Sequence, residues 1–412
     1  MAKKIFVAIL FFLLGIGRNL PYNNLFFFGL GIADFLLVSF FFLYFLLNKP
    51  HFQLLVNNNK GIVNLMLVFL AWNLGSVIIN MPFFGINLLD ILESLRILYM
   101  IIIILATFFF TIKYKTLPGI SFVFGIVFSG FIAYLNPMNP DVLGTVQIFN
   151  PNVIGNILSF SCIFLVLLMY LGANKVINSC LFIICFSFAF FTYSKATWVM
   201  LIISLLAFVL FFKQQFSKFN LLKKILAIII LMILIQSITS SKKYNEFMSV
   251  GKLILTSKIE NSGFGSSASE GSSVGARLGL SYSGFYMFLQ SPIWGVGVGN
   301  FQKVNDQNKI ELGKYYYQDD NANSLIFHLL GTIGFVGLFI FFRILYSFYK
   351  QTLNLCKVYD VPKFYNYLLL STILISINFQ RELLTAYYFW ILFGTTLGFV
   401  YIKTNLTPNT NE

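Results

Sequence analysis

Three positively charged side chains are, by type and spacing, the best candidates for chemistry in this chain. Lys195, Arg277 and Arg381 have no acidic neighbour in sequence, apart from Glu382 beside Arg381. Guanidinium and ammonium groups bind anions, and they also stabilise negative charge that develops during a reaction. If the fold brings these cations together, we expect them to surround one anion.

Arg96 is a fourth cation of interest, but it has a local partner. It follows Glu93 by three residues, so the two side chains share one face of a helix. A structural ion pair is therefore as good an interpretation of Arg96 as a role in ligand binding.

Other kinds of site find little support in the sequence. No His, Cys and carboxylate cluster has metal-ligand spacing, and no glycine-rich nucleotide-binding motif is present. We therefore expect no metal and no cofactor, and an ATP-driven pump is disfavoured. The four cysteines lie in apolar segments or in a loop rich in lysine, which does not indicate a disulfide framework.

The composition is that of a membrane protein. The 412 residues are 58% hydrophobic and 10% charged, whereas soluble domains are about 25% charged. The formal net charge of +14 does not require a nucleic-acid partner, because lysine and arginine accumulate on the cytoplasmic side of membrane proteins.

The apolar segments predict an all-α integral membrane protein with about twelve transmembrane helices, because lipid leaves no water for unpaired backbone groups. A cleaved signal peptide is the alternative for the first segment. The expected spans are residues 4–17, 25–47, 61–80, 94–112, 119–135, 153–172, 177–193, 196–212, 221–239, 324–346, 364–379 and 383–402.

Lysine-rich loops fall on one side of this arrangement, which predicts that both termini are cytoplasmic. The chain then divides into an N-terminal bundle of about nine helices over 1–239, a large outer loop over 240–322 and about three C-terminal helices over 323–412. An outer loop of this length is usually functional.

The outer loop has its own order. Residues 262–275 are rich in glycine and serine and indicate a flexible linker. An amphipathic helix at the membrane surface is expected from about residue 273 to Pro292. Its apolar face would hold Leu278, Tyr282, Phe285, Tyr286 and Leu289. The sequence "SPIWGVGVGNF" follows, in which Gly295, Gly297 and Gly299 permit positive φ angles. A plain surface loop is the alternative for this stretch.

Four segments together resemble the O-antigen ligase and polymerase superfamily of bacterial membrane glycosyltransferases. "FNPNVIG" contains Asn152, and "SKATW" contains Lys195 and Trp198, with the lysine in place of the usual arginine. The third segment runs from Arg277 through Pro292 and the glycines. The fourth is "NSLIFHLLGTIGFVGLFIF" at 323–341. The resemblance covers roughly residues 145–345.

The resemblance implies a GT-C-like glycosyltransferase of the bacterial inner membrane, with its large loop in the periplasm. It implies an undecaprenyl-diphosphate-linked oligosaccharide as donor, membrane lipids as surroundings, and a chain-length regulator and a flippase as partners. Arg277, Lys195, Arg96 and Arg381 would bind the diphosphate, and Asn152, Trp198, Pro292 and the three glycines would shape the loop over a cavity.

Asp319, Asp320 and Asn323 complete the set of expected catalytic residues, together with Arg277. The two carboxylates are the acids nearest the matching region and could act as a general base. The alternative is that they stabilise the N-terminus of the following helix by their charge.

The resemblance favours a repeat-unit polymerase over a ligase. Family ligases typically carry a His-Asn pair where the outer loop re-enters the membrane, whereas this sequence has Asn323 and Ser324 there, and His328 follows more than a turn later. A ligase that transfers glycan to lipid A core stays open, as does a transporter or flippase of lipid-linked sugars, although no internal repeat supports the latter.

Overall fold

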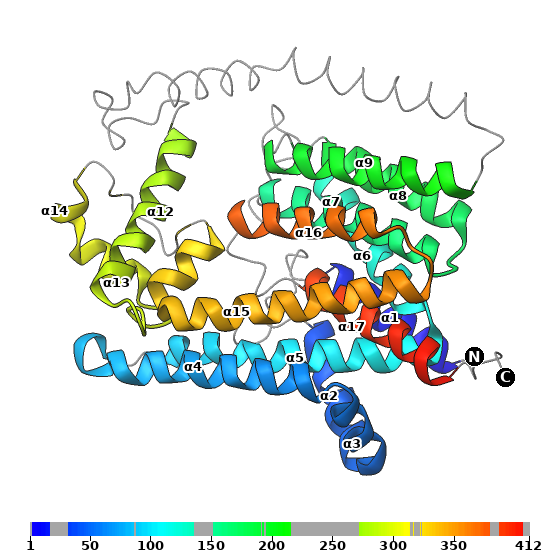
Figure 1. Cartoon of the computed structure of the whole chain (residues 1–412), viewed down its shortest axis with the longest axis horizontal. Helices are drawn as coiled ribbons and strands as arrows, with labels where there is room; N and C mark the ends of the chain where they lie inside the picture. The colour runs from blue at the N-terminus through cyan, green and yellow to red at the C-terminus, as the bar shows by residue number, and fades with distance from the viewer. Residues whose placement is uncertain are drawn as a thin grey trace. The chain divides into compact units, whose positions relative to one another are not determined.

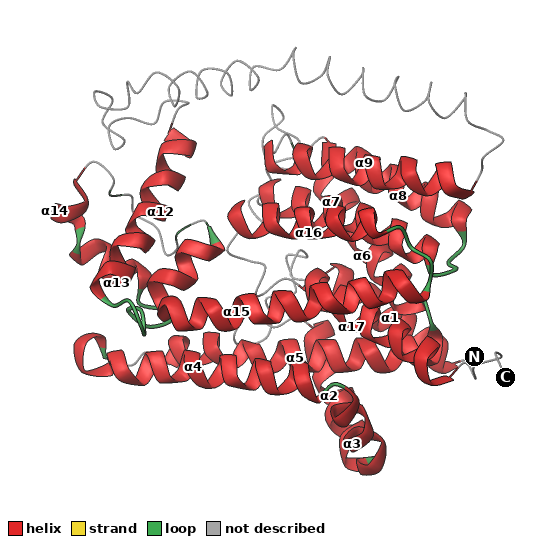
Figure 2. Ribbon diagram, viewed as in Figure 1, coloured by secondary structure: helices red, strands yellow, loops and turns green. Residues whose placement is uncertain are grey.

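The computed structural model describes residues 2–16, 32–85, 88–135, 151–190, 192, 195–215, 272–313, 316, 322, 324–379 and 387–406. All regular structure within these residues is helical, as Figure 2 shows. The predicted all-α class is therefore confirmed.

The helices agree closely with the predicted spans (Figure 1). Their bounds are α1 Ala2–Ile16, α2 Ile32–Leu47, α3 Lys49–Asn58, α4 Lys60–Phe84, α5 Leu88–Tyr114, α6 Leu117–Leu135, α7 Pro151–Tyr170, α8 Lys175–Phe190, α9 Lys195–Gln215, α12 Ser272–Gln290, α13 Phe301–Gln307, α14 Lys309–Leu312, α15 Leu325–Val358, α16 Lys363–Phe379 and α17 Tyr387–Tyr401, which continues into a π-helix over Ile402–Leu406.

Among the described residues, three helices are long and apolar enough to cross a membrane: Lys60–Phe84, Ile91–Tyr114 and Leu325–Val358. Shorter apolar helices occupy most of the other expected spans. The protein is therefore an integral membrane protein, and the total of twelve spans stays a prediction. The expected span over 221–239 lies outside the described residues.

Some elements were not expected from the sequence. The short helix α3 has a mean hydropathy too low for a span, and Pro50 lies in its first turn, where the fixed φ of proline suits a helix start. Helix α15 extends to Val358, beyond the predicted end of the span at 346, because apolar length predicts only the part of a helix that lipid surrounds.

The chain forms two compact units. The first contains residues 1–71, 92–208 and 340–412. Its central helix is α7, whose residues 162–169 are all almost completely buried. Helices α6, α8, α16 and α17 contact α7, and the Tyr365 hydroxyl donates a hydrogen bond of 2.6 Å to the carbonyl oxygen of Ile163. A helix that is apolar all round is buried either in protein or in lipid, and this part of α7 is buried in protein.

The second unit contains residues 72–91 and 209–339. Its described part consists of the C-terminal half of α4, the helices α12, α13 and α14, and the N-terminal part of α15. This unit holds Arg277 and the glycine-rich segment, and the candidate site is described within it.

Candidate functional site

The glycine-rich segment forms a tight turn over residues 291–300, called here the glycine turn. Gly295, Gly297 and Gly299 all have positive φ angles, of 68°, 95° and 86°. At Gly295 a β-carbon would also lie 2.3 Å from the carbonyl carbon of Thr332 in α15. The backbone of the turn thus touches the backbone of α15, and only glycine satisfies both the conformation and the space.

The glycine turn contacts α15 where that helix is broken. Gly334 has φ 69° and ψ −173°, which interrupts the helical geometry. In a continuous helix the amide of Phe335 would donate to the carbonyl of Gly331. Here the Phe335 amide donates to the carbonyl of Pro292 at 2.9 Å, and the Gly331 carbonyl accepts from the Val296 amide at 2.9 Å. The turn and the helix therefore exchange backbone hydrogen bonds.

The next two carbonyls of the break are satisfied as well. The Thr332 carbonyl accepts from the amide of Gly297 at 2.9 Å, and the Ile333 carbonyl accepts from the indole Nε1 of Trp72 at 2.9 Å. An unpaired carbonyl in an apolar environment costs several kcal/mol. The break is thus stable only because the turn and α4 supply donors.

Helix α4 contributes three side chains at intervals of four residues: Trp72, Ser76 and Asn80. The Ser76 hydroxyl lies 2.7 Å from the carbonyl oxygen of Trp294 and 3.1 Å from that of Thr332. The Asn80 amide donates to the carbonyl of Gly295 at 3.1 Å. The rings of Trp72 and Trp294 stack with centroids 4.0 Å apart and an angle of 9° between planes. We call Trp72, Ser76 and Asn80 the α4 polar stripe.

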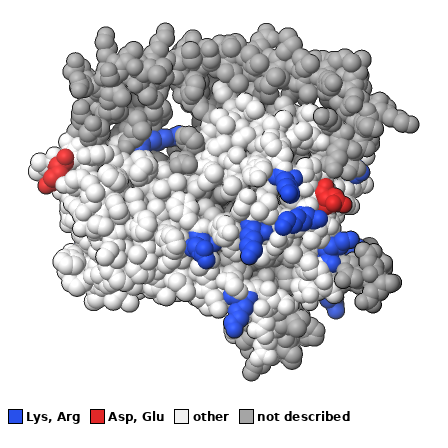
Figure 3. Space-filling model, in the orientation of Figure 1, with Lys and Arg blue, Asp and Glu red and all other residues white. Residues whose placement is uncertain are grey.

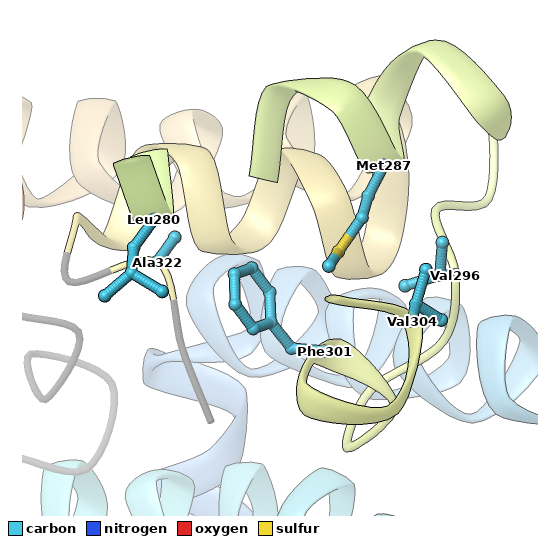
Figure 4. Packing of buried hydrophobic residues seen from close by; sticks show 6 residues of the cluster. All are labelled: Leu280, Met287, Val296, Phe301, Val304 and Ala322. Carbon is cyan, nitrogen blue, oxygen red and sulfur yellow. The ribbon is translucent and has the colours of Figure 1, made fainter. Parts of the chain in front are cut away.

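Helix α12 is joined to the same framework by a small apolar core (Figure 4). Leu280 and Met287 point from α12 into this core, where they meet Val296 of the glycine turn and Phe301 of α13. Val304 and Ala322 complete the cluster.

The backbones of α12 and α15 also lie very close together at two glycines. A β-carbon on Gly331 would lie 2.8 Å from the carbonyl oxygen of Gly284. Helix α12 is thus fixed both to the glycine turn and to α15.

Arg277 lies in the second turn of α12 and is half-buried. Burial lowers the pKa of its guanidinium group, but an arginine side chain stays protonated in proteins. No acidic side chain in the described part of the chain forms an ion pair with Arg277. A half-buried cation that has no ion-pair partner among the described residues is suited to bind an anionic ligand.

The apolar face expected on α12 is exposed. Tyr282, Phe285 and Leu289 are 41%, 39% and 58% exposed, while Leu280 and Met287 on the other side are fully buried. The helix is therefore apolar on both faces, one of which packs on protein. An exposed apolar face beside membrane-length helices is suited to a lipid surface.

A comparison with protein-family models identifies this region of the chain. The model described as O-antigen ligase matches residues 180–342. This match supports the resemblance of the chain to the O-antigen ligase and polymerase superfamily. Members of this superfamily are glycosyltransferase-like enzymes. No curated protein sequence matches the chain.

The O-antigen ligase match includes Arg277, the whole glycine turn and the break at Gly334. It also includes the start of α9, where Lys195 is the first helical residue. Trp198 is buried there, and its indole donates to the carbonyl of Phe190 at 3.3 Å. The indole of Trp198 thus links the start of α9 to the last residue of α8.

Two further predicted residues lie before the matched segment. Asn152 is the second residue of α7, which begins at Pro151 as expected for a proline at a helix start. Arg96 forms an ion pair with Glu93 at 3.6 Å. The structure therefore confirms the ion pair that the sequence suggested for Arg96. The role of Arg96 in binding a diphosphate stays a prediction.

Asp319, Asp320, Asn323 and Arg381 lie outside the described residues. Their proposed roles rest on the sequence alone. The linker predicted over 262–275 is wrong at its end, because residues 272–275 form the first turn of α12, and residues 262–271 lie outside the described residues. The described surface seen in Figure 3 is mostly uncharged, with lysine and arginine more frequent than acidic residues.

Sequence reasoning missed several residues that build the site. It assigned nothing to Trp72, Ser76 and Asn80, although their spacing of four in an apolar helix was a usable signal. It also noted His328 only as displaced from the ligase position. That side chain is buried in the first turns of α15, with its ring 5.5 Å from the ring of Phe301.

Proposed function

We propose that the protein is a surface-polysaccharide polymerase, which joins undecaprenyl-diphosphate-linked repeat units by glycosyl transfer at the periplasmic face of the bacterial inner membrane. The observation that carries the proposal is Arg277, a half-buried cation with no acidic partner among the described residues, within a segment that matches the O-antigen ligase family. The surrounding helices would form a GT-C-like bundle of about twelve spans, with both termini in the cytoplasm.

The reaction needs little more than positioning and charge stabilisation. The hydroxyl oxygen of the acceptor sugar forms a bond to the anomeric carbon of the donor, and the bond from that carbon to the diphosphate oxygen breaks. The electron pair leaves with the lipid diphosphate, and the acceptor proton passes to a base. Arg277 would stabilise the charge that builds on the leaving diphosphate. Asp319, Asp320 and Asn323 are our candidates near the acceptor hydroxyl.

Three other cations are candidate diphosphate ligands, and the support for each differs in strength. Lys195 begins α9 within the matched segment, and Arg381 precedes α17 in sequence. Arg96 is the weakest of the three, because Glu93 already neutralises it. Asn152, Trp198, Pro292 and the three glycines would shape the site without touching the reacting atoms.

Two alternatives each rest on a specific observation. A ligase that transfers glycan to lipid A core is favoured by the match to a family described as O-antigen ligase. A transporter or flippase is favoured by the break in α15, because discontinuous helices line the substrate sites of many transporters. The polymerase is preferred over a ligase because the position before α15 holds Asn323 and Ser324 instead of a His-Asn pair.

A surface-glycan gel from a strain that lacks the protein tests the proposal. A core that carries a single repeat unit without a ladder supports the polymerase. A bare core with polymer on the lipid carrier indicates the ligase. A bare core with no polymer on the carrier, or an unchanged ladder, contradicts both and favours the transporter or another glycan.

Complementation of that strain tests Arg277 directly. Arg277→Ala should lower elongation by about a hundredfold to a thousandfold, as for the loss of one key charge donor, while the protein still inserts. Arg343→Ala is the matched control, because Arg343 is an exposed arginine near the ring of Tyr346. A normal ladder with well-expressed Arg277→Ala would overturn the assignment. A chain-length regulator and a flippase are the expected partners in the cell.

A further inference from the structure

The α4 polar stripe has an unusual place in this fold. Trp72, Ser76 and Asn80 lie within a helix long and apolar enough to cross a membrane, and none of them lies in the segment that matches the O-antigen ligase family. All three nevertheless donate hydrogen bonds to backbone carbonyls of that segment. These bonds add nothing to the backbone ladder of α4 itself.

The stripe acts on both partners of the exchanged backbone bonds. Ser76 reaches one carbonyl of the glycine turn and one of α15, Trp72 reaches the carbonyl beside the break, and Asn80 reaches the turn. Asn80 also donates to the carbonyl of Ser76 at 2.9 Å, which fixes its own amide. The three donors therefore hold the turn and the broken helix against one rigid helix face.

This framework is continuous with Arg277. Val296 of the glycine turn packs in the same core as Leu280, one helical turn after Arg277. The backbone of α12 touches α15 at Gly284 and Gly331. A shift of the turn against α4 would therefore move the helix that carries the guanidinium group.

We propose that Trp72, Ser76 and Asn80 are positioning residues for glycosyl transfer, which hold the glycine turn and the break of α15 so that Arg277 meets the leaving diphosphate. The inference rests on the proposed function of Arg277. The stripe touches no reacting atom, and it acts by setting the geometry of the residues that do. Misplacement of a catalytic group by about 1 Å costs up to about a hundredfold in rate.

A positioning role and a merely structural role differ in their kinetics. Loss of an interaction that matters only in the transition state lowers kcat per folded molecule and leaves KM nearly unchanged. Loss of folded protein lowers only the number of active molecules, so kcat is calculated per molecule of folded protein recovered from size-exclusion chromatography. We expect Ser76→Ala, Asn80→Ala and Trp72→Phe each to lower kcat by between about tenfold and about a hundredfold. KM should stay within about twofold, because these side chains do not contribute to binding of the substrate in its ground state.

The experiment uses the full chain in lipid nanodiscs and the lipid-linked repeat units extracted from the strain that lacks the protein. Trp72→Phe keeps a stacking ring but removes the indole donor, so it separates the hydrogen bond from the packing. Ser76→Thr restores a hydroxyl and should recover most of the rate. Thr396→Val is the matched control, because the buried Thr396 hydroxyl donates only within its own helix, to Leu392 at 2.9 Å.

A second readout does not depend on activity. The four tryptophans are Trp72, Trp198, Trp294 and Trp390, and the stacked indoles of Trp72 and Trp294 should give a coupled pair of circular-dichroism bands. The pair should weaken in the Ser76→Ala, Asn80→Ala double variant and persist in Thr396→Val.

The outcomes separate the two proposals. Unchanged kcat and an unchanged pair of bands in the double variant, with an active wild-type protein, would overturn the positioning role alone. Equal loss of kcat in Thr396→Val would also overturn it, because the effect would then be general. If the wild-type protein transfers no glycan, the proposed function fails and the catalytic part of the inference fails with it.

Discussion

Two regions of this protein carry the sequence motifs, and each is stabilised internally by a different kind of interaction. The glycine turn and the break of α15 are joined mainly by backbone hydrogen bonds, such as that from the Val296 amide to the Gly331 carbonyl. The start of α9 is joined to α7 by side chains instead. The Thr197 hydroxyl donates to the Asn156 side chain at 3.3 Å, and the Ser204 hydroxyl donates to the Ser159 carbonyl at 3.1 Å.

The difference decides how each region tolerates change. A backbone contact has no room for a new side chain and cannot adapt by rotating one. A side-chain contact can lose a partner and repack at a moderate cost. We therefore expect the glycine turn to be sensitive to any added atom, and the α7–α9 contact to be sensitive mainly to lost polar groups.

The largest expected effect is from Gly334→Ala. Its β-carbon would lie 2.2 Å from the carbonyl oxygen of Ile293, and φ is 69° with ψ −173°, so the variant combines a clash with the cost of a backbone conformation essentially restricted to glycine, about 1–3 kcal/mol. We expect loss of most folded protein, measured by size-exclusion chromatography after detergent extraction.

Two controls sharpen this prediction. Gly313 has φ 51° but open space around it, so Gly313→Ala isolates the conformational cost. Gly61 has neither a positive φ nor a neighbour within 4 Å, so Gly61→Ala should leave the yield unchanged or raise it slightly. Normal yield of Gly334→Ala would show that the break can close or shift.

The next effect in size is Gly155→Ala in the other region. A β-carbon there would lie 2.3 Å from the Thr197 hydroxyl and 2.5 Å from that of Thr192. Both contacts are with side-chain atoms, so partial relief is possible, and we expect a destabilisation of about 1–3 kcal/mol. A melting temperature as low as that of Gly334→Ala would contradict the comparison.

Thr197→Val should have a smaller effect. It keeps the shape of the side chain but removes the donor to Asn156, both of which are fully buried. The acceptor left behind costs about 1–3 kcal/mol, at the low end because the bond is long. Thermal unfolding in detergent measures the shift, with Thr396→Val as the control for a buried hydroxyl that bonds only within its helix.

The smallest expected effect is from Trp198→Phe. The ring of Trp198 stacks on Phe190 with centroids 6.2 Å apart, and the phenyl ring retains most of this contact. The indole bond to the Phe190 carbonyl is lost, which costs about 1 kcal/mol. A loss of glycan ladder without a change in melting temperature would instead place Trp198 close to the substrate.

The sequence predicted the helices well, because apolar length and lysine-rich boundaries directly reflect the demands of lipid. Spans such as 153–172 and 364–379 agree with α7 and α16 to within a few residues. The glycine turn was also predictable, since alternating glycines after Pro292 have few other uses. The break at Gly334 was not, because Gly331, Gly334 and Gly337 all lie in the same apolar helix, and a glycine in a helix costs only about 1 kcal/mol without breaking it.

The sequence by itself determined that this is an all-helical membrane protein with a glycine-rich turn and an isolated Arg277. Those features follow from local composition and from the conformations that each residue type allows. The tertiary structure alone decided that the turn exchanges hydrogen bonds with a broken α15 and that Trp72, Ser76 and Asn80 hold the two together. The physical reason is that a freed carbonyl in an apolar environment takes any donor within reach, and only the packing of helices distant in sequence decides which donor that is.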